Sequence, residues 1–319
     1  VGATSHGSSD DSPYQAYSAF AGNPYLISLD ALVEEGVLTR EECDNVSFGE
    51  TAAKVDFDQL HEHRFALLHK AYERSGISAN PDYQNFIRDN GWWLNDYALF
   101  MALKTFFHDQ PFRAWPEDIR MHWGFALEHY NRELYFDIEF QKYMQFKFNQ
   151  QWSRLKAYAN GKHIQIVGDI PIYVSPDGAD VWAHPELFQL DEHNAPTAIA
   201  GCPPDAFAED GQVWGNPLYN WNFHRATDYA WWVSRMWYSF KLYDVVRIDH
   251  FRGFDEYFSI PADAKTARGG HWEKGPGMEL FNSIRRHLGN VSVIAEDLGL
   301  MTDGVRALVR DSGYPNMKV

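Results

Sequence analysis

Three short apolar segments that each end in a carboxylate constrain the fold of this chain most. They are His163-Ile-Gln-Ile-Val-Gly-Asp169, Asp244-Val-Val-Arg-Ile-Asp249 and Val291-Ser-Val-Ile-Ala-Glu296. Helical patterns such as 229–242 and 278–288 lie between them, and strands that alternate with helices are typical of parallel βα units. A doubly wound sheet and a (β/α)8 TIM barrel both fit this pattern, and both bind ligands at the carboxyl ends of their strands. The barrel is favoured because the glycine-rich phosphate motifs GxGxxG and GxxxxGK[ST] are missing.

The predicted fold class is therefore α/β, and the rest of the chain is arranged around the barrel segment. Residues 1–28 are rich in turn residues and are expected to form loops at the start of the barrel. Residues 29–160 are predicted to be a mainly helical insertion subdomain, because apolar residues recur at about four-residue spacing from Phe136 to Leu155. Gly161 stands where a helix C-cap belongs. Residues 161–319 are predicted to be the central part of the barrel.

The composition excludes several classes of partner. Acidic residues outnumber basic ones 44 to 28, which disfavours nucleic acid because a phosphate backbone is held by a surplus of Lys and Arg. Apolar runs are shorter than the roughly 20 residues of a bilayer span, so no membrane partner is expected. Aromatic residues form 16% of the chain, a load that suits sugar binding because pyranose faces stack on rings. Two cysteines are too few for a disulfide framework or a cysteine-based zinc site, which suits a reducing compartment.

The three strand-terminal acids, Asp169, Asp249 and Glu296, are the strongest candidates for chemistry. In a barrel the ends of different strands meet at one mouth, so acids far apart in sequence can lie together. The alternative is that each acid caps the helix after its strand. Arg247 precedes Asp249 by two residues, so both side chains point to one face of a strand. Its guanidinium is expected to lower the pKa of Asp249 and keep that carboxyl ionised.

Glu296 ends an apolar strand, where loss of solvent and neighbouring acids are expected to raise its pKa. Two carboxyls whose pKa values are pushed apart can serve as nucleophile and general acid, the arrangement of a retaining glycosidase. The alternative is an ion pair of Arg247 with Asp249 that only stabilises the barrel.

Residues 200–219 form a segment that is too long and too rich in Gly and Pro for a simple connection, and such segments are often functional lids. Trp214, beside Gly215, is a candidate stacking platform for a sugar, although a Trp packed under its own loop fits equally well. No metal or cofactor is predicted. His61 and His63 would lie on different sides of a helix, and HExxH, EF-hand and GxSxG motifs are absent from the sequence.

Whole strings of this chain resemble the 4-alpha-glucanotransferases of glycoside hydrolase family 77. The strings are Ser12-Pro-Tyr-Gln15, Ser18-Ala-Phe-Ala-Gly-Asn-Pro-Tyr-Leu26, Val167-Gly-Asp-Ile-Pro-Ile-Tyr-Val174, Ala179-Asp-Val-Trp-Ala-His-Pro-Glu186, Gly211-Gln-Val-Trp-Gly-Asn-Pro-Leu218, Val246-Arg-Ile-Asp-His-Phe-Arg-Gly253 and Ala295-Glu-Asp-Leu-Gly299. The resemblance implies a (β/α)8 barrel with helical insertions. It also implies transfer of α-1,4-glucan segments by a retaining double displacement.

The same resemblance implies a role for each candidate residue. Asp249 would be the nucleophile and Glu296 the acid/base. Five further residues would contact the substrate: Arg247 and His250 around the sugar at the cleavage point, Asp169 as the acid of the first shared motif, Tyr14 as a stacking ring, and Trp214 over the acceptor side.

Two departures from the family pattern accompany the resemblance. The segment before Ser12 is longer than the usual turn, and His6 stands where a Tyr is common, which puts an accessory glucan contact in doubt. The family's third catalytic acid would lie beyond Val319, so the barrel is expected to be incomplete in this chain, which is expected to be inactive on its own.

The sequence thus predicts a cytoplasmic enzyme, or a plastidial one in a plant or alga, that acts on maltooligosaccharides, starch or glycogen. Two alternatives stay open. One is an α-amylase-type hydrolase, in which water takes the sugar, and the other is a non-catalytic glucan-binding protein.

Overall fold

The computed structural model describes the chain except residues 1, 6–10, 52, 207, 300 and 318–319. His6, the departure noted above, therefore lies outside the described residues. The chain divides into two compact units, residues 1–155 and 156–319, and the division falls within one long helix.

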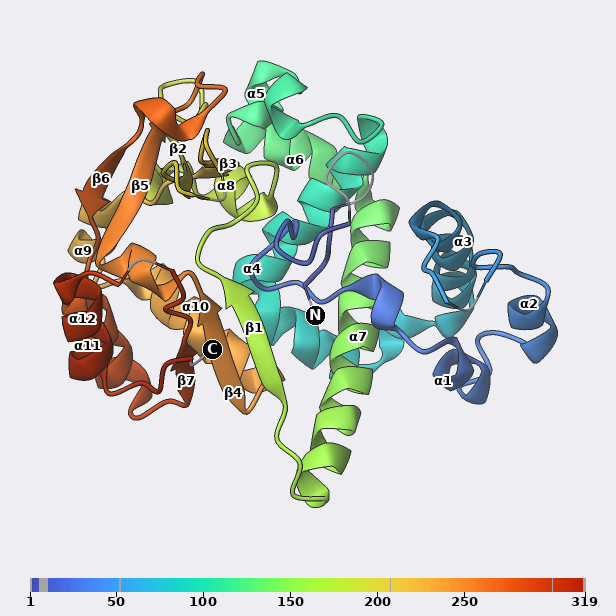
Figure 1. The fold of residues 1–319 in the computed structure, drawn as a ribbon. Coiled ribbons are helices and arrows are strands. Elements are labelled where there is room, and N and C mark those ends of the chain that lie inside the picture. The colour runs from blue at the N-terminus through green and yellow to red at the C-terminus, as the bar shows by residue number, and fades with distance from the viewer. Residues whose placement is uncertain (1, 6–10, 52, 207, 300, 318–319) are drawn as a thin grey trace. The chain divides into compact units, whose positions relative to one another are not determined.

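The first unit is built mainly from helices (Figure 1). Asn80 shows how the sequence begins one of them: its side chain accepts the backbone N–H groups of Asp82 and Tyr83, and Pro81 follows at the first helical position. The preceding helix ends at Gly76, whose positive φ of 55° suits a residue without a Cβ. The helices are α1 (Leu29–Glu34), α2 (Arg40–Asp44), α3 (Phe57–Ser75), α4 (Pro81–Phe106), α5 (Glu117–Arg120), α6 (Gly124–Glu133) and α7 (Tyr135–Gly161), with 3-10 turns η1 (Pro24–Leu26), η2 (Ile77–Ala79) and η3 (Phe112–Ala114).

The second unit contains two sheets. The parallel sheet has the order β1-β4-β7, and its strands lie at the three positions that the sequence predicted. The other sheet is antiparallel, with the order β3-β2-β5-β6. The strands are β1 (Val167–Pro171), β2 (Ala198–Cys202), β3 (Gln212–Pro217), β4 (Val245–Asp249), β5 (Glu256–Pro261), β6 (His271–Lys274) and β7 (Val293–Ala295). The helices are α8 (Ala179–Ala183), α9 (Trp221–Ala226), α10 (Ala230–Leu242), α11 (Met278–Leu288) and α12 (Asp303–Ser312), with 3-10 turns η4 (Pro185–Leu187), η5 (Phe251–Phe254) and η6 (Ala267–Gly269).

The antiparallel sheet differs from the sequence prediction for residues 200–219. Instead of a long loop, this segment contains the end of β2 and all of β3, paired as antiparallel strands. Gly201 permits the pairing, because a Cβ there would lie 2.0 Å from the carbonyl oxygen of Gln212. Trp214 therefore lies on a strand of a sheet and not on a loop.

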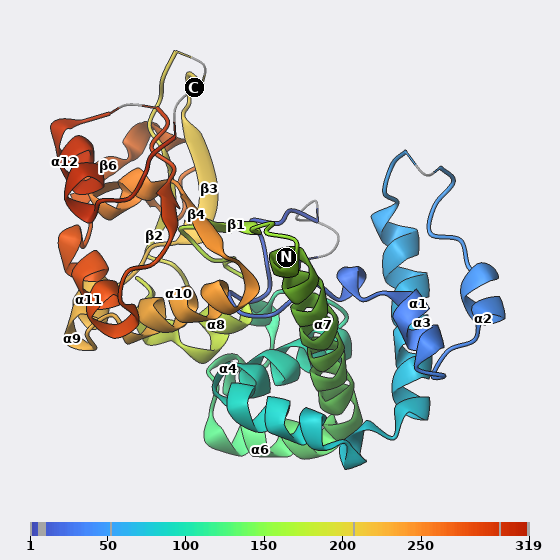
Figure 2. The ribbon, with the colours of Figure 1, turned by 90° about the horizontal axis from the view of Figure 1, so that it is seen from below.

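The apolar face of the parallel sheet packs against helices that contribute aromatic side chains to the core. Val246 and Ile248 of β4 are buried, and the residues between them point to the other face, as the period of two requires. α10 packs against β4 and α11, as both views show (Figure 1, Figure 2). In the core beside β4, Phe251 stacks on Phe281 of α11 with ring centroids 5.0 Å apart. Burial of such rings supplies much of the favourable free energy of folding.

Candidate active site

The parallel strands bring the predicted acids to neighbouring positions in one sheet. In the register of β1 and β4, Asp169 is the partner of Arg247, and β4 ends at Asp249. β7 is the neighbour of β4 on its other side, and Glu296 directly follows its last residue. Asp249 ends β4 and Glu296 directly follows β7, as the sequence predicted. The prediction that Asp169 also ends its strand is wrong, because β1 continues past it to Pro171; Asp169 meets the site through Arg247 instead.

A single guanidinium joins two of these acids. Arg247 Nη1 lies 2.6 Å from Asp169 Oδ1, and Arg247 Nη2 lies 3.0 Å from Asp249 Oδ1. Its Nε donates to the sulfur of Met317 at 3.2 Å. Using both ends of the planar fork fixes the side chain in one orientation. Asp249 is thereby held in place while a third of its side chain remains exposed to solvent.

The pKa of Asp249 departs from the sequence prediction. The prediction that the neighbouring guanidinium would lower it on balance is wrong, because the pKa is raised. Burial is the largest cause and outweighs the opposing effect of Arg247, and the charge of Glu296 adds to the increase. The sequence identified Arg247 as the charged partner of Asp249, but it did not show how deeply the carboxyl of Asp249 is buried.

Glu296 is buried, and both its backbone and its side chain are hydrogen-bonded to β4 and the residue that follows it. Its Oε2 accepts the backbone N–H of His250 at 2.8 Å, and its Oε1 accepts that of Leu298 at 2.7 Å. Its backbone N–H donates to the carbonyl of Ile248 at 3.1 Å. These bonds fix the carboxyl beside the residue that follows Asp249. Sequence reasoning missed the two backbone donors, since a backbone N–H leaves no signal in the residue type.

His250 directly follows β4 and contacts Trp214. It has a left-handed φ of 55°, which is uncommon for a residue with a side chain. Its ring meets that of Trp214 edge-on, with centroids 4.9 Å apart. Burial, with a smaller contribution from the charge of Arg252, lowers the pKa of His250 to about 4, so the imidazole is neutral near pH 7. Trp214 is half-buried, and its Nε1 donates to Gln212 Oε1 at 2.9 Å.

The second unit thus brings together six of the seven predicted site residues: Asp169, Trp214, Arg247, Asp249, His250 and Glu296. Tyr14 belongs to the first unit, where its side chain is 39% exposed, and its place beside the reacting sugar stays a prediction.

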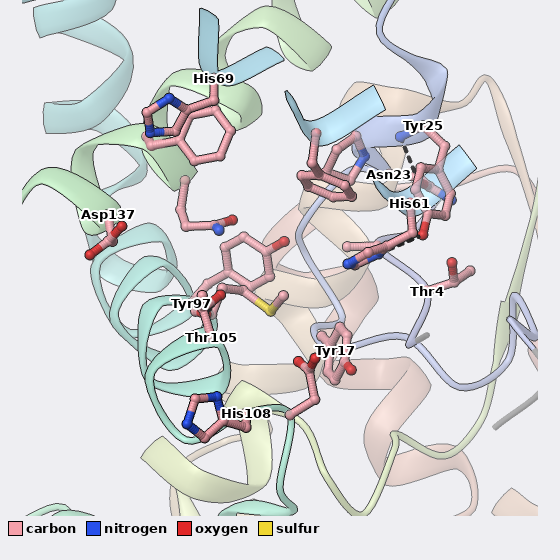
Figure 3. Close-up of a pocket in the computed structure, with 17 residues that line it drawn as sticks. Thr4, Tyr17, Asn23, Tyr25, His61, His69, Tyr97, Thr105, His108 and Asp137 are labelled. Atoms are coloured by element: carbon pink, nitrogen blue, oxygen red, sulfur yellow. Dashed lines mark hydrogen bonds between the residues drawn. The ribbon is translucent and has the colours of Figure 1, made fainter. Parts of the chain in front are cut away.

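A cavity of about 500 Å³ lies in the first unit, lined by side chains that include Tyr25, His61 and Tyr97 (Figure 3). None of the predicted site residues lines it. Within the described part of the chain, no cluster of three or more His, Cys, Asp or Glu side chains could hold a metal ion. In the same part, no helix has the length and apolarity to cross a membrane.

Comparisons with known proteins identify the family of this chain. A family model described as 4-alpha-glucanotransferase (Glyco_hydro_77) matches residues 1–319. The 4-alpha-glucanotransferase of Streptococcus pneumoniae is 47% identical over 321 residues, which cover 100% of this chain and 63% of that protein. That of Thermus thermophilus is 43% identical over 100% of this chain and 63% of its own length. The chloroplastic/amyloplastic 4-alpha-glucanotransferase of Arabidopsis thaliana is 37% identical, over 97% of this chain and 54% of its own length.

A solved structure confirms the fold. The amylomaltase from Streptococcus agalactiae, determined in complex with acarbose, superposes with a TM-score of 0.96 at 41% sequence identity. The match covers 100% of this chain and 64% of that one, so this chain spans less than two thirds of the relatives it matches. The predicted α/β fold is confirmed: the parallel sheet is part of a (β/α)8 barrel that is incomplete in this chain. The chain belongs to the 4-alpha-glucanotransferase family, glycoside hydrolase family 77.

Proposed function

We propose that the protein containing this chain transfers α-1,4-glucan segments between maltooligosaccharides, starch or glycogen by a retaining double displacement. One observation carries the proposal: Arg247 holds Asp249 at the end of β4, while Glu296 is hydrogen-bonded to the backbone of the next residue. A nucleophile and an acid/base fixed on neighbouring strands suit this chemistry. Support also comes from relatives named as 4-alpha-glucanotransferases.

In the first step an oxygen of Asp249 attacks the anomeric carbon, and the glycosidic bond to the leaving sugar breaks. Glu296 donates its proton to the leaving oxygen, which departs as a hydroxyl. In the second step a hydroxyl of an acceptor glucan attacks the same carbon, and the bond to Asp249 breaks. Glu296 takes the acceptor's proton and returns to its starting state. Two inversions leave the anomeric configuration unchanged.

We assign the remaining site residues to substrate binding. Asp169, Arg247 and His250 surround the sugar at the cleavage point, and the neutral imidazole of His250 can donate to a sugar hydroxyl. Trp214 lies on β3 and holds the acceptor sugar by stacking, while Tyr14 stacks beside the reacting sugar. We place the protein in the cytoplasm, or in a plastid in a plant or alga, which suits its two free cysteines.

The proposal is tested by giving the full-length protein maltotriose and separating the products by chromatography. A transferase produces glucose together with maltopentaose and longer chains. Glucose and maltose without longer chains would favour the α-amylase-type hydrolase. Binding of maltotriose without any product would favour the non-catalytic glucan-binding protein, a reading that the paired carboxyls speak against.

A further inference from the structure

Arg235 is a buried arginine of α10. It makes no hydrogen bond to any of the seven predicted site residues, all of which the structure describes. The side chain of Arg235 is among the most buried charged groups of the described residues, with 3% relative exposure. Nη2 donates to the carbonyl of Pro171 at 2.6 Å, and Nη1 donates to that of Ile172 at 3.0 Å. Its guanidinium also lies over the ring of Trp232, 4.9 Å from the centroid.

The two carbonyls belong to the segment that follows the acid of β1. Asp169 stands two residues before Pro171, and Pro171 is the register partner of Asp249. Fixing these carbonyls therefore fixes the end of β1 at the position where Asp169 meets Arg247. The contact acts on the backbone, so it sets the position of the strand rather than the charge of the site.

The same guanidinium also reaches the segment that follows Trp214. Arg235 Nη1 donates to the hydroxyl of Tyr219 at 3.3 Å, and that hydroxyl donates to the carbonyl of Ile172 at 2.7 Å. Asn216, the second residue after Trp214, donates to the carbonyl of Val174 at 2.7 Å. One buried polar network thus joins the end of β1 to the end of β3.

Stability alone does not account for this arrangement. A buried charge is costly unless it is paired, and none of the hydrogen bonds of Arg235 goes to a carboxylate. Packed apolar side chains in place of buried ionic groups are often neutral or stabilising. What an apolar side chain cannot supply is a rigid fork of donors that ties three acceptors from two segments into one geometry.

We propose that Arg235 is a positioning residue that sets the distance between the acceptor-binding Trp214 and the Asp169–Arg247–Asp249 chain, and thereby the partition between transfer to sugar and hydrolysis. The proposal rests on the proposed function. Small displacements of a binding group can cost as much as ~10²-fold in rate. A sugar acceptor must be held by Trp214, whereas water needs no such platform, so displacement of β3 reduces transfer more than hydrolysis.

The partition is measured in the full-length protein with maltotriose, as the ratio of maltopentaose formed to the increase in total reducing ends. Transfer conserves the number of reducing ends, whereas each hydrolysis adds one. Arg235→Met keeps the length of the side chain and removes the donors, and we expect the ratio to fall by at least about tenfold. Arg235→Lys keeps the positive charge but lacks the planar guanidinium, and its ratio is expected to lie between those of Arg235→Met and the wild type. Met236→Ala, at a fully buried neighbour on α10, is the matched control that lowers stability and leaves the ratio unchanged. The ratio does not depend on how many molecules are folded, which separates positioning from a merely structural role.

A second measurement needs no activity. Amide hydrogen exchange of residues 172–174 and 216–219 is expected to become about tenfold faster in Arg235→Met than in Met236→Ala under matched stability. If Arg235→Met does not fold, Tyr219→Phe removes only the hydroxyl shared by the network, and both readouts should shift in the same direction. An unchanged ratio with unchanged exchange in both segments overturns the proposal. If the wild type forms no longer chains, the proposed function fails, and the exchange rates alone then decide the role of Arg235.

Discussion

A fully buried histidine predicts how the stability of the second unit depends on pH. His224 of α9 has no exposed surface, and its Nε2 lies 3.2 Å from the carbonyl of Leu187, to which it donates. Burial lowers its pKa to about 4, against weaker opposing effects of that hydrogen bond and of Glu186. The folded state therefore holds the imidazole neutral in a range where the unfolded chain, with a pKa of about 6.5, binds a proton.

The sign and size of the pH effect on the free energy of unfolding follow from proton linkage. Between about pH 6.5 and pH 4 the unfolded state binds more protons at this residue, so the free energy of unfolding decreases as the pH falls. For a pKa that changes from 6.5 to about 4, the loss between pH 7 and pH 5 is about 2 kcal/mol. His250, whose pKa is also lowered to about 4, acts in the same window and adds to the loss.

The assay is urea unfolding of the full-length protein at pH 7 and pH 5, followed by tryptophan fluorescence. Trp231 lies near His224, with ring centroids 6.2 Å apart, and is one of the 12 tryptophans of the chain that contribute to the signal. His224→Gln should reduce the pH-dependent loss by about 2 kcal/mol, while His193→Gln, at an exposed histidine, should leave it unchanged. An equal pH dependence in His224→Gln and wild type would refute the reasoning.

Three further outcomes are expected. Trp214→Ala should shift the products of maltotriose toward hydrolysis, seen by chromatography, and an unchanged distribution would remove Trp214 from the acceptor role. Arg247→Met should move the acid limb of the pH profile of kcat/KM to higher pH, because the guanidinium opposes the raised pKa of Asp249, and an unmoved limb would contradict that assignment. Gly201→Ala should destabilise the antiparallel sheet by about 1–3 kcal/mol in urea unfolding, whereas Gly269→Ala, which meets open space, should not.

The strands that carry the acids could be predicted because their signal is local. In β4 the buried Val246 and Ile248 alternate with Arg247 and Asp249, and this alternation can be read directly from the sequence. The positions of Asp249 and Glu296 at the ends of their strands then follow from barrel geometry. The extension of β1 past Asp169 to Pro171 was not predicted. The pattern already suggested a nucleophile and a general acid among Asp249 and Glu296, whereas the roles of the substrate-binding residues came from the resemblance to the family.

The antiparallel sheet could not be predicted, because its strands lack such a signal. β2 contains Gly201, and β3 contains both Gly215 and Pro217, residues that ordinarily indicate turns. Their pairing depends on partners distant in sequence, such as β5. The raised pKa of Asp249 was missed for the same reason, since burial is a property of the assembled fold.

The central claim is that Asp249 is the nucleophile and Glu296 the acid/base. It is tested most directly by trapping the glycosyl-enzyme of the full-length protein with a slow fluorinated maltosyl substrate and locating the adduct by peptide mass spectrometry. The adduct is expected on Asp249 in the wild type and in Glu296→Gln, and on no residue in Asp249→Asn. An adduct on any other carboxyl, or one that persists in Asp249→Asn, would contradict the assignment.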